Sequence, residues 1–272
     1  MSLNEILFLG TGGGMFSVGK QLRASGGIVL RISGIQFHLD PGPGALVRAK
    51  EYGVNPRETN VLLASHSALD HCNDVNIMIE SMTHSGLDKS GIFLGSKSVI
   101  YGEENKKPYL TRDHKKQIEK YLALEPGNKV KFNNNISVVA LKTKHNDKTN
   151  IGFKFINDKF AIGYTSDTGY FPELADELKG CEVLIINNLK PFGHHDPHHL
   201  SSDDTIKLLR QVRPKLAIIT HFDQKMLEQD PIYQARQIQM QTKVQTIAAR
   251  DGMSVNPITY AATRDNKSMQ FY

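Results

Sequence analysis

Two imidazoles and a carboxylate lie close together in residues 65–71, whose sequence is Ser-His-Ser-Ala-Leu-Asp-His. An apolar run that predicts a buried strand, residues 60–65, ends directly before His66, and apolar residues at helical spacing follow Asp74. Nitrogen and carboxylate oxygen ligands suit Zn²⁺, Fe²⁺ or Mn²⁺, and a loop between a strand and a helix can bring them together. The segment therefore predicts a metal site, although a surface loop with two solvated histidines explains it equally well when it is taken alone.

Three further residues with ligand side chains stand at the ends of strand-like runs. They are His145 after residues 137–142, Asp167 after residues 160–164, and His221 after residues 216–219. Any one of them alone would more often be a surface histidine or a capping aspartate. Loops at strand ends are where α/β proteins usually gather their sites, so four such places in one chain favour a shared metal centre.

The elements that would position these side chains alternate between strands and helices. Short apolar runs predict strands at residues 5–9, 27–32, 35–39, 60–65, 136–141, 152–156, 160–164 and 183–186. Helical spacing predicts helices at residues 45–51, 74–82, 174–178 and 203–212, and a glutamine-rich helix at 231–250 with Ile232, Ala235, Ile238 and Met240 inward. No repeat or domain boundary is visible, so we expect one α/β domain over residues 1–272, with two sheets flanked by helices.

The composition is that of an ordinary globular protein. Of 272 residues, 39% are hydrophobic and 22% charged, which excludes a disordered, collagen-like or coiled-coil chain. The two cysteines exclude a disulfide framework and are typical of a reducing compartment. The apolar runs are too short to cross a membrane and no secretory signal is visible, so we expect a cytoplasmic protein without membrane association.

The charge balance favours an anionic partner. The formal net charge is +5, and five basic residues stand in one polar stretch: Lys106, Lys107, Arg112, Lys115 and Lys116. Such a stretch could follow the phosphates of RNA or DNA, but acidic residues interrupt it, and a solvated face is the alternative. The 11 histidines favour metal binding, because imidazole is a common metal ligand.

A set of motifs resembles the metallo-β-lactamase-fold superfamily, and most closely its ribonuclease Z and cyclic phosphodiesterase branch. The set comprises residues 8–12 (FLGTG) with Arg23, residues 40–44 (DPGPG), the 66–71 cluster, His145, residues 163–169 (GYTSDTG), residues 199–201 (HLS) and residues 220–222 (THF). The resemblance implies an αββα four-layer sandwich with one or two Zn²⁺ ions between its sheets, Mn²⁺ or Fe²⁺ being the alternatives. Homodimers are frequent among proteins of this family.

The resemblance also implies the ligands and the catalytic groups. Asp167 would bridge both ions, of which the first would take His66 and His145. The second would take the remaining ligands, which are Asp70, His71 and His221. Asp70 would also orient or deprotonate the attacking hydroxide, and His199 would contact the scissile group or protonate the leaving oxygen.

The sequence departs from the family motif HxHxDH at its second histidine, which is Ala68 here. A methyl group cannot bind metal, so we expect a weakened first site or occupancy of the second site alone. Three protein ligands and water still make an acceptable zinc site. Nearby histidines could also fill the gap, and residues 194–199 (HHDPHH) offer candidates. A solvated loop is the alternative interpretation for His194, His195 and His198.

A second departure concerns the glutamate that supports the catalytic histidine in ribonuclease Z. Its position falls at Asn187, which carries no charge to stabilise an imidazolium at His199. The maturation of transfer RNA is therefore not the expected activity.

The surviving residues still predict a metal-dependent hydrolase. We expect a phosphodiesterase that attacks nucleic acid or a cyclic nucleotide through an activated water. A carboxylic ester, lactone or thioester would be attacked in the same way. The alternative of a different class is a catalytically weakened binding or scaffold protein of the same fold, which the residues at positions 68 and 187 motivate.

Overall fold

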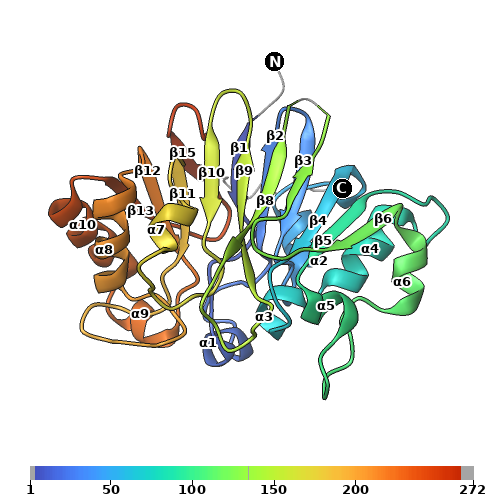
Figure 1. The fold of residues 1–272 in the computed structure, drawn as a ribbon, viewed down its shortest axis with the longest axis horizontal. Coiled ribbons are helices and arrows are strands. Elements are labelled where there is room, and N and C mark those ends of the chain that lie inside the picture. The colour runs from blue at the N-terminus through green and yellow to red at the C-terminus, as the bar shows by residue number, and fades with distance from the viewer. Residues whose placement is uncertain (1–3, 134, 265–272) are drawn as a thin grey trace. The chain divides into compact units, whose positions relative to one another are not determined.

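The computed structural model describes residues 4–133 and 135–264, whose helices and strands are labelled in Figure 1. The chain divides into two compact units. Unit 1 combines the segment up to Thr11 with Ala24–Ala123 and the segment from Arg250 onward. Unit 2 combines Gly12–Arg23 with Leu124–Ala249. Each unit contains one sheet, which confirms the expected α/β fold with two sheets. The assignment of residues 1–272 to a single domain stays a prediction.

The sheet of unit 1 has the order β15-β14-β1-β2-β3-β4-β5-β6. Its strands are β1 (Glu5–Phe8), β2 (Ile28–Ile32), β3 (Ile35–Leu39), β4 (Thr59–Ala64), β5 (Ile92–Gly95), β6 (Lys120–Ala123), β14 (Met253–Val255) and β15 (Ala262–Arg264). The predicted hairpin is β2–β3, and its two turn residues, Ser33 and Gly34, both have positive φ, as a tight hairpin turn requires. Strands β3 to β6 run parallel, so the residues that follow β4 lie at the carboxyl edge of the sheet.

Helices cover this sheet and enclose its core. They are α2 (Ala45–Glu51), α3 (Leu69–Cys72), α4 (Val75–Thr83), α5 (Lys97–Tyr101) and α6 (Arg112–Gln117), with a 3₁₀ turn η1 at Pro56–Glu58. The apolar stripe of α4, which includes Met78, Ile79 and Met82, is fully buried together with Leu62 and Phe93 of the strands. Packing of this stripe fixes the position of α4. The short segment between β4 and α4, which includes α3 and carries His66 and His71, is therefore held at both of its ends.

The sheet of unit 2 has the order β13-β12-β11-β10-β9-β8-β7. Its strands are β7 (Lys129–Lys131), β8 (Ser137–Lys142), β9 (Ile151–Ile156), β10 (Ala161–Tyr164), β11 (Val183–Asn187), β12 (Leu216–Thr220) and β13 (Gln245–Ala248). Strands β10 to β13 run parallel. The carboxyl ends of β10, β11 and β12 therefore meet at one edge, which is where Asp167, Asn187 and His221 lie.

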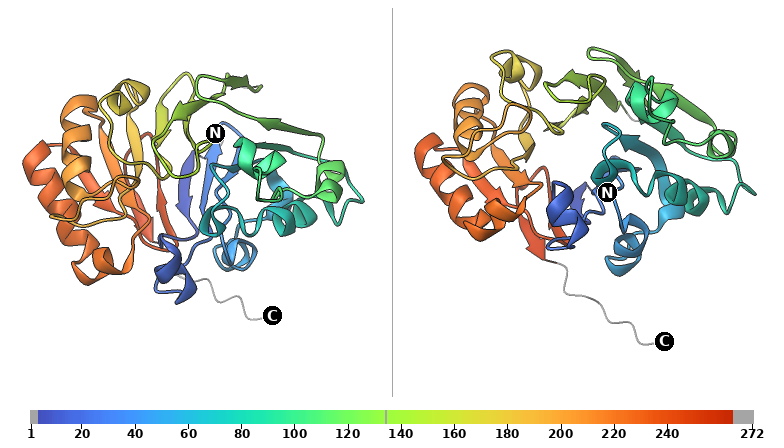
Figure 2. Two further views of the ribbon diagram at one scale, coloured as in Figure 1. Left: turned by 60° about the horizontal axis from the view of Figure 1, so that its bottom comes forward. Right: turned by 90° about the horizontal axis from the view of Figure 1, so that it is seen from below.

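The helices in the described part of unit 2 are α1 (Met15–Gly19), α7 (Leu174–Glu177), α8 (Ser202–Val212), α9 (Gln224–Glu228) and α10 (Pro231–Thr242). Figure 2 shows α8 and α10 side by side along the sheet. A capping box fixes the start of α8, because Ser201 and Asp204 each accept a hydrogen bond from the other's backbone N–H. Within residues 4–133 and 135–264, every helix falls short of the length and apolarity that a bilayer crossing needs.

The prediction of one long helix over residues 231–250 is wrong in its second half. Helix α10 ends at Thr242, and Lys243 follows with a φ of 62°, so the chain turns and continues as the parallel strand β13. Ala235 and Ile238 are buried as expected, but Met240 is 62% exposed because it lies off the apolar stripe.

Buried His38 on β3 is expected to make the stability of the protein sensitive to acid. Its Nε2 lies 2.8 Å from the carbonyl oxygen of Gly26. Burial lowers the pKa of His38 and outweighs the opposing hydrogen bond to Gly26 and the charges of Asp74 and Asp40. Below the ordinary histidine pKa of 6.5, the imidazole is therefore protonated more readily in the unfolded chain than in the folded chain. The free energy of unfolding should fall as the pH drops below that value, by at most about 1.4 kcal/mol per pH unit.

The variant His38→Gln keeps a donor for Gly26 and cannot titrate. Urea unfolding of both chains in chelator, between pH 5 and pH 8, measures the effect. The difference between the two unfolding free energies should narrow as the pH falls below 6.5. If the free energies of unfolding of the two chains change with pH by the same amount over that range, the prediction is wrong.

Candidate metal centre

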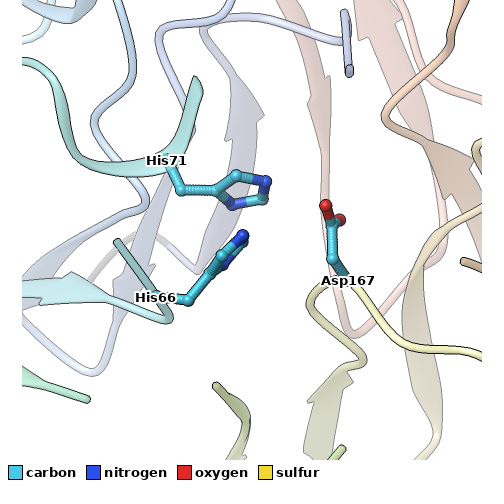
Figure 3. Close-up of side chains that lie close together, drawn as sticks. All are labelled: His66, His71 and Asp167. Carbon is cyan, nitrogen blue, oxygen red and sulfur yellow. The ribbon is translucent and has the colours of Figure 1, made fainter. Parts of the chain in front are cut away.

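In unit 1, the end of β4 and the start of α3 bring three predicted ligands together. The side chains of His66, Asp70 and His71 are all buried. Figure 3 shows the imidazole rings of His66 and His71 next to each other. Their centroids are 4.2 Å apart and their planes are inclined by 49°. Oδ2 of Asp70 lies 3.8 Å from Nε2 of His71. The reading of residues 65–71 as a surface loop with solvated histidines is therefore wrong.

A buried carboxylate holds this cluster in place. Asp40, which directly follows β3, accepts hydrogen bonds from the backbone N–H of Ser65 at 2.7 Å and from its Oγ at 2.8 Å. Oδ2 of Asp40, which accepts from the Oγ of Ser65, also lies 2.9 Å from Nδ1 of His71. A carboxylate on Nδ1 keeps the proton there and presents Nε2 as the ligand, which is how metal-binding histidines are commonly oriented. In the sequence, Asp40 stands out only as part of the DPGPG motif, and its contact with His71 appears only in the structure.

Close backbone contact explains the glycine at position 42. A Cβ atom there would lie 2.1 Å from the carbonyl oxygen of Asp70 and 2.4 Å from that of Ser25. The carbonyl oxygen of Pro41 also accepts the N–H of Asp74 at 2.9 Å. The 40–44 turn therefore packs directly against the backbone that carries the ligands, and a side chain at position 42 would displace it.

Ala68 contributes backbone hydrogen bonds to the cluster. Its carbonyl oxygen accepts the N–H groups of His71 at 3.0 Å and Cys72 at 3.1 Å, which begins helix α3. Its methyl group offers no donor atom, so an ion bound here would receive no ligand from this position.

In unit 2, the carboxylate of Asp167 lies at the centre of the predicted ligands. Its Oδ1 is 3.1 Å from Nε2 of His221, and its Oδ2 is 3.5 Å from Nε2 of His199. Asp167 is 4% exposed and His221 is 7% exposed. A carboxylate with a different imidazole at each oxygen has the arrangement that a bridging ligand needs.

Asn187 supports Asp167 rather than His199. Its Nδ2 donates to Oδ1 of Asp167 at 2.7 Å and to the hydroxyl of Tyr164 at 3.1 Å. The carboxylate partner of His199 is Asp196 instead, with 3.2 Å between Nδ1 and Oδ1. Asn187 therefore gives His199 no charged partner, as the sequence predicts, but Asp196 from the histidine's own loop supplies one.

The pKa of His199 reflects these neighbours. Burial by itself lowers the pKa of His199, but the hydrogen bonds and negative charges of Asp167 and Asp196 outweigh it and raise the pKa above the ordinary value. Without metal, the imidazole is therefore held between two carboxylates.

Hydrogen bonds join the loop of His145 to the loop of Asp167. The N–H of Lys144 donates to Thr168 Oγ1 at 2.9 Å, and its carbonyl oxygen accepts the N–H of Gly169 at 2.8 Å. The side chain of Asn150 adds a bond to the carbonyl oxygen of Asp167. Ligand atoms of His145, Asp167 and His199 all lie within 4.8 Å of one another.

The other histidines of the 194–199 loop have different surroundings. His195 is exposed, and Nε2 of His194 lies 3.5 Å from the amide nitrogen of Gln229. The ring of His198 lies 6.4 Å from that of His145, against 5.2 Å for the ring of His199. Of the two histidines in this loop whose rings contact the ring of His145, His199 is therefore the nearer one.

The donor set of each unit fits a divalent metal ion. Each set combines imidazole nitrogens and carboxylate oxygens near strand ends, and among them only His145 and His199 are partly exposed. This mixture suits Zn²⁺ and admits Mn²⁺ or Fe²⁺. The supporting carboxylates and amides orient these donors before any ion arrives. The catalytic roles of Asp70 and His199 stay predictions.

The basic stretch of residues 106–116 is partly engaged with its own surroundings. Nζ of Lys115 donates to the carbonyl oxygen of Ile100 at 2.6 Å, and Lys116 pairs with Asp113 at 3.1 Å. These contacts favour the reading of a solvated face over a patch dedicated to phosphates.

Known proteins resemble this chain over nearly its whole length. A family model described as the beta-lactamase superfamily domain matches residues 36–222. An uncharacterized protein of Methanocaldococcus jannaschii, MJ1374, is 36% identical over 253 residues, which are 92% of this chain and 94% of the relative. A protein of Sulfolobus acidocaldarius named ribonuclease Z is 20% identical over 84% of this chain and 91% of its own.

A solved structure agrees with the fold. The metallo-beta-lactamase fold protein YhfI of Bacillus subtilis superimposes with a TM-score of 0.78 at 16% identity, covering 93% of this chain and 99% of that protein. The predicted metallo-β-lactamase type of the fold is thereby confirmed.

Proposed function

Since this chain belongs to the beta-lactamase superfamily and shares its fold with a metallo hydrolase of Ignicoccus hospitalis, we propose that it is a metal-dependent phosphodiesterase. We propose as metal ligands the residues His66, Asp70, His71, His145, Asp167 and His221. The contacts of Asp167 carry the proposal: a buried carboxylate with His221 at one oxygen and His199 at the other.

The second support comes from how the ligands are oriented. Asp40 holds Nδ1 of His71, and Asn187 holds one oxygen of Asp167. Hydrogen bonds of this kind fix the direction of a donor atom, as the residues behind the ligands of a metal site do. A scaffold protein would not need buried carboxylates beside buried imidazoles, because hydrophobic residues would pack there at lower cost.

The chemistry divides between the ion and the protein. A divalent ion makes water a stronger acid and polarises the oxygen of a phosphoryl group. Asp70, buried at the start of α3, orients the attacking water and accepts its proton. The supporting residues hold these groups in a fixed geometry, so little reorganisation is needed during the reaction.

A phosphodiester of nucleic acid or of a cyclic nucleotide is the proposed substrate class. The net charge of +5 attracts an anion, and the Sulfolobus relative is named for an activity on RNA. Carboxylic esters, lactones and thioesters are the competing substrates, because the same water would attack them.

The variant Asp70→Ala should reduce hydrolysis of bis-p-nitrophenyl phosphate by at least about 1,000-fold, because it removes both a ligand and the proton acceptor. The assay is run on chelator-treated protein with and without added Zn²⁺ or Mn²⁺. p-Nitrophenyl acetate tests the ester alternative under the same conditions.

Asp113→Ala is the matched control, since the side chain of Asp113 is 83% exposed on α6. It should keep the full rate. A chain that binds no transition metal and shows no turnover stimulated by metal would refute the hydrolase, and full activity of Asp70→Ala would refute the proposed site.

A further inference from the structure

We propose that His199 is a metal ligand, which with His145 and Asp167 supplies the donor that Ala68 cannot. This inference rests on the proposed function, because it concerns the first ion of that site. It replaces the role of proton donor that the family resemblance implies for His199, since the nitrogen that ligates a metal carries no proton.

The distances within unit 2 fit one ion. Donors at about 2.0–2.2 Å from a tetrahedral Zn²⁺ lie about 3.3–3.6 Å from one another. Nε2 of His199 lies 3.5 Å from Oδ2 of Asp167. The ligand atoms of His145, Asp167 and His199 all lie within 4.8 Å of one another, so small side-chain rotations complete the geometry.

The second observation is the carboxylate behind His199. Oδ1 of Asp196 lies 3.2 Å from Nδ1 of His199. The same oxygen accepts the backbone N–H of His198 at 2.9 Å, which fixes the carboxylate. Asp196 therefore stands to His199 as Asp40 stands to His71: each places the proton on Nδ1 and turns Nε2 toward a neighbouring carboxylate.

The backbone around His199 is held close to the loop of Asp167. A Cβ atom on Gly169 would lie 2.0 Å from the carbonyl oxygen of Pro197, so only glycine permits this approach of the two loops. After His199, the N–H of Lys190 donates to the carbonyl oxygen of Leu200 at 3.2 Å, and the capping box at Ser201 starts α8. Contacts on both sides thus position the imidazole beside Asp167.

The experiment measures Zn²⁺ bound to chelator-treated protein, by elemental analysis and by calorimetric titration, with circular dichroism as the check of folding. His199→Ala should lower the bound Zn²⁺ by about one ion per chain, as should His145→Ala. His199→Gln serves if the alanine variant does not fold. Asp196→Asn should keep the number of ions and weaken first-site affinity by about 10–100-fold.

Two further variants separate His199 from its alternatives. His198→Ala is the matched control, because its ring also lies near His145, and it should leave the bound Zn²⁺ unchanged. Ala68→His should not raise the Zn²⁺ content of the wild-type chain, because the vacant ligand position is already filled. The same substitution should restore Zn²⁺ to His199→Ala. Co²⁺ absorption spectra report the change in coordination independently of activity.

The outcomes distinguish this inference from the proposed function. If His145→Ala loses Zn²⁺ while His199→Ala retains it, His199 is no ligand and the hydrolase site stands without it. If Ala68→His raises the Zn²⁺ content of the wild-type chain, the position was vacant and the inference is wrong. If neither His145→Ala nor His199→Ala changes the Zn²⁺ content, the proposed metal site itself fails.

Discussion

Replacing Asp167 by alanine is expected to lower metal-dependent hydrolysis by on the order of 1,000-fold or more, and Zn²⁺ affinity by more than about 100-fold. The reason is that both oxygens of this carboxylate face imidazoles, His221 at 3.1 Å and His199 at 3.5 Å. The substitution therefore removes the negatively charged metal ligand that lies beside both histidines. Calorimetric Zn²⁺ titration and the phosphodiesterase assay measure the two effects.

Asp167→Asn separates charge from shape. The amide keeps the size of the side chain and an oxygen that can accept from Asn187, so the metal-free variant should fold with almost unchanged thermal stability. Its Zn²⁺ affinity should still fall, because a neutral amide is a poorer ligand than a carboxylate. Wild-type Zn²⁺ affinity in Asp167→Asn would show that Asp167 is a structural residue.

Local periodicity was sufficient to predict the elements that carry most of the site. The hairpin of β2 and β3, strand β4 and helix α4 follow from apolar spacing, because one face of each is buried. The strand β13 was missed because Gln245 and Thr246 continue the polar composition of the preceding helix. Its place beside β12 is set by long-range pairing, which no window of local sequence contains.

The ligand types could be predicted, but their supports could not. His66 and His71 stand out in a short segment, whereas the partners of the cluster come from elsewhere in the chain. Asp40 lies 31 positions before His71 and reads only as a turn residue. Asn187 supports Asp167, and Asp196 instead of Asn187 contacts His199. The second contact depends on loop geometry, because the bend of the 194–199 loop is what brings Asp196 next to His199.

The second large effect is expected at Asp40, which determines both the stability of unit 1 and the direction of His71. Asp40 is 4% exposed and receives bonds from Ser65 at two atoms and contacts Nδ1 of His71. Asp40→Ala should lower the free energy of unfolding by about 3–5 kcal/mol, because buried polar groups lose a charged partner. A φ of 52° adds strain for alanine, since aspartate and asparagine adopt this region more readily.

The variant Asp40→Asn separates the effect of Asp40 on stability from its effect on the orientation of His71. Asparagine tolerates the positive φ and keeps one acceptor, so urea unfolding should show a smaller loss of stability than in Asp40→Ala. If its oxygen stays on the N–H of Ser65, its amide nitrogen faces Nδ1 of His71 and has to donate to it. The proton of the imidazole then moves to Nε2, which is the atom that would bind the ion.

Zn²⁺ affinity should therefore fall by about 10–100-fold in Asp40→Asn although the chain remains folded. Urea unfolding in chelator and calorimetric Zn²⁺ titration give the two quantities separately, and nitrogen chemical shifts of the imidazole report the tautomer of His71 directly. If Asp40→Asn binds Zn²⁺ as tightly as the wild type with the proton still on Nδ1, the carboxylate does not orient His71. A stability loss equal to that of Asp40→Ala would instead show that charge, and not the position of the proton, is what Asp40 contributes.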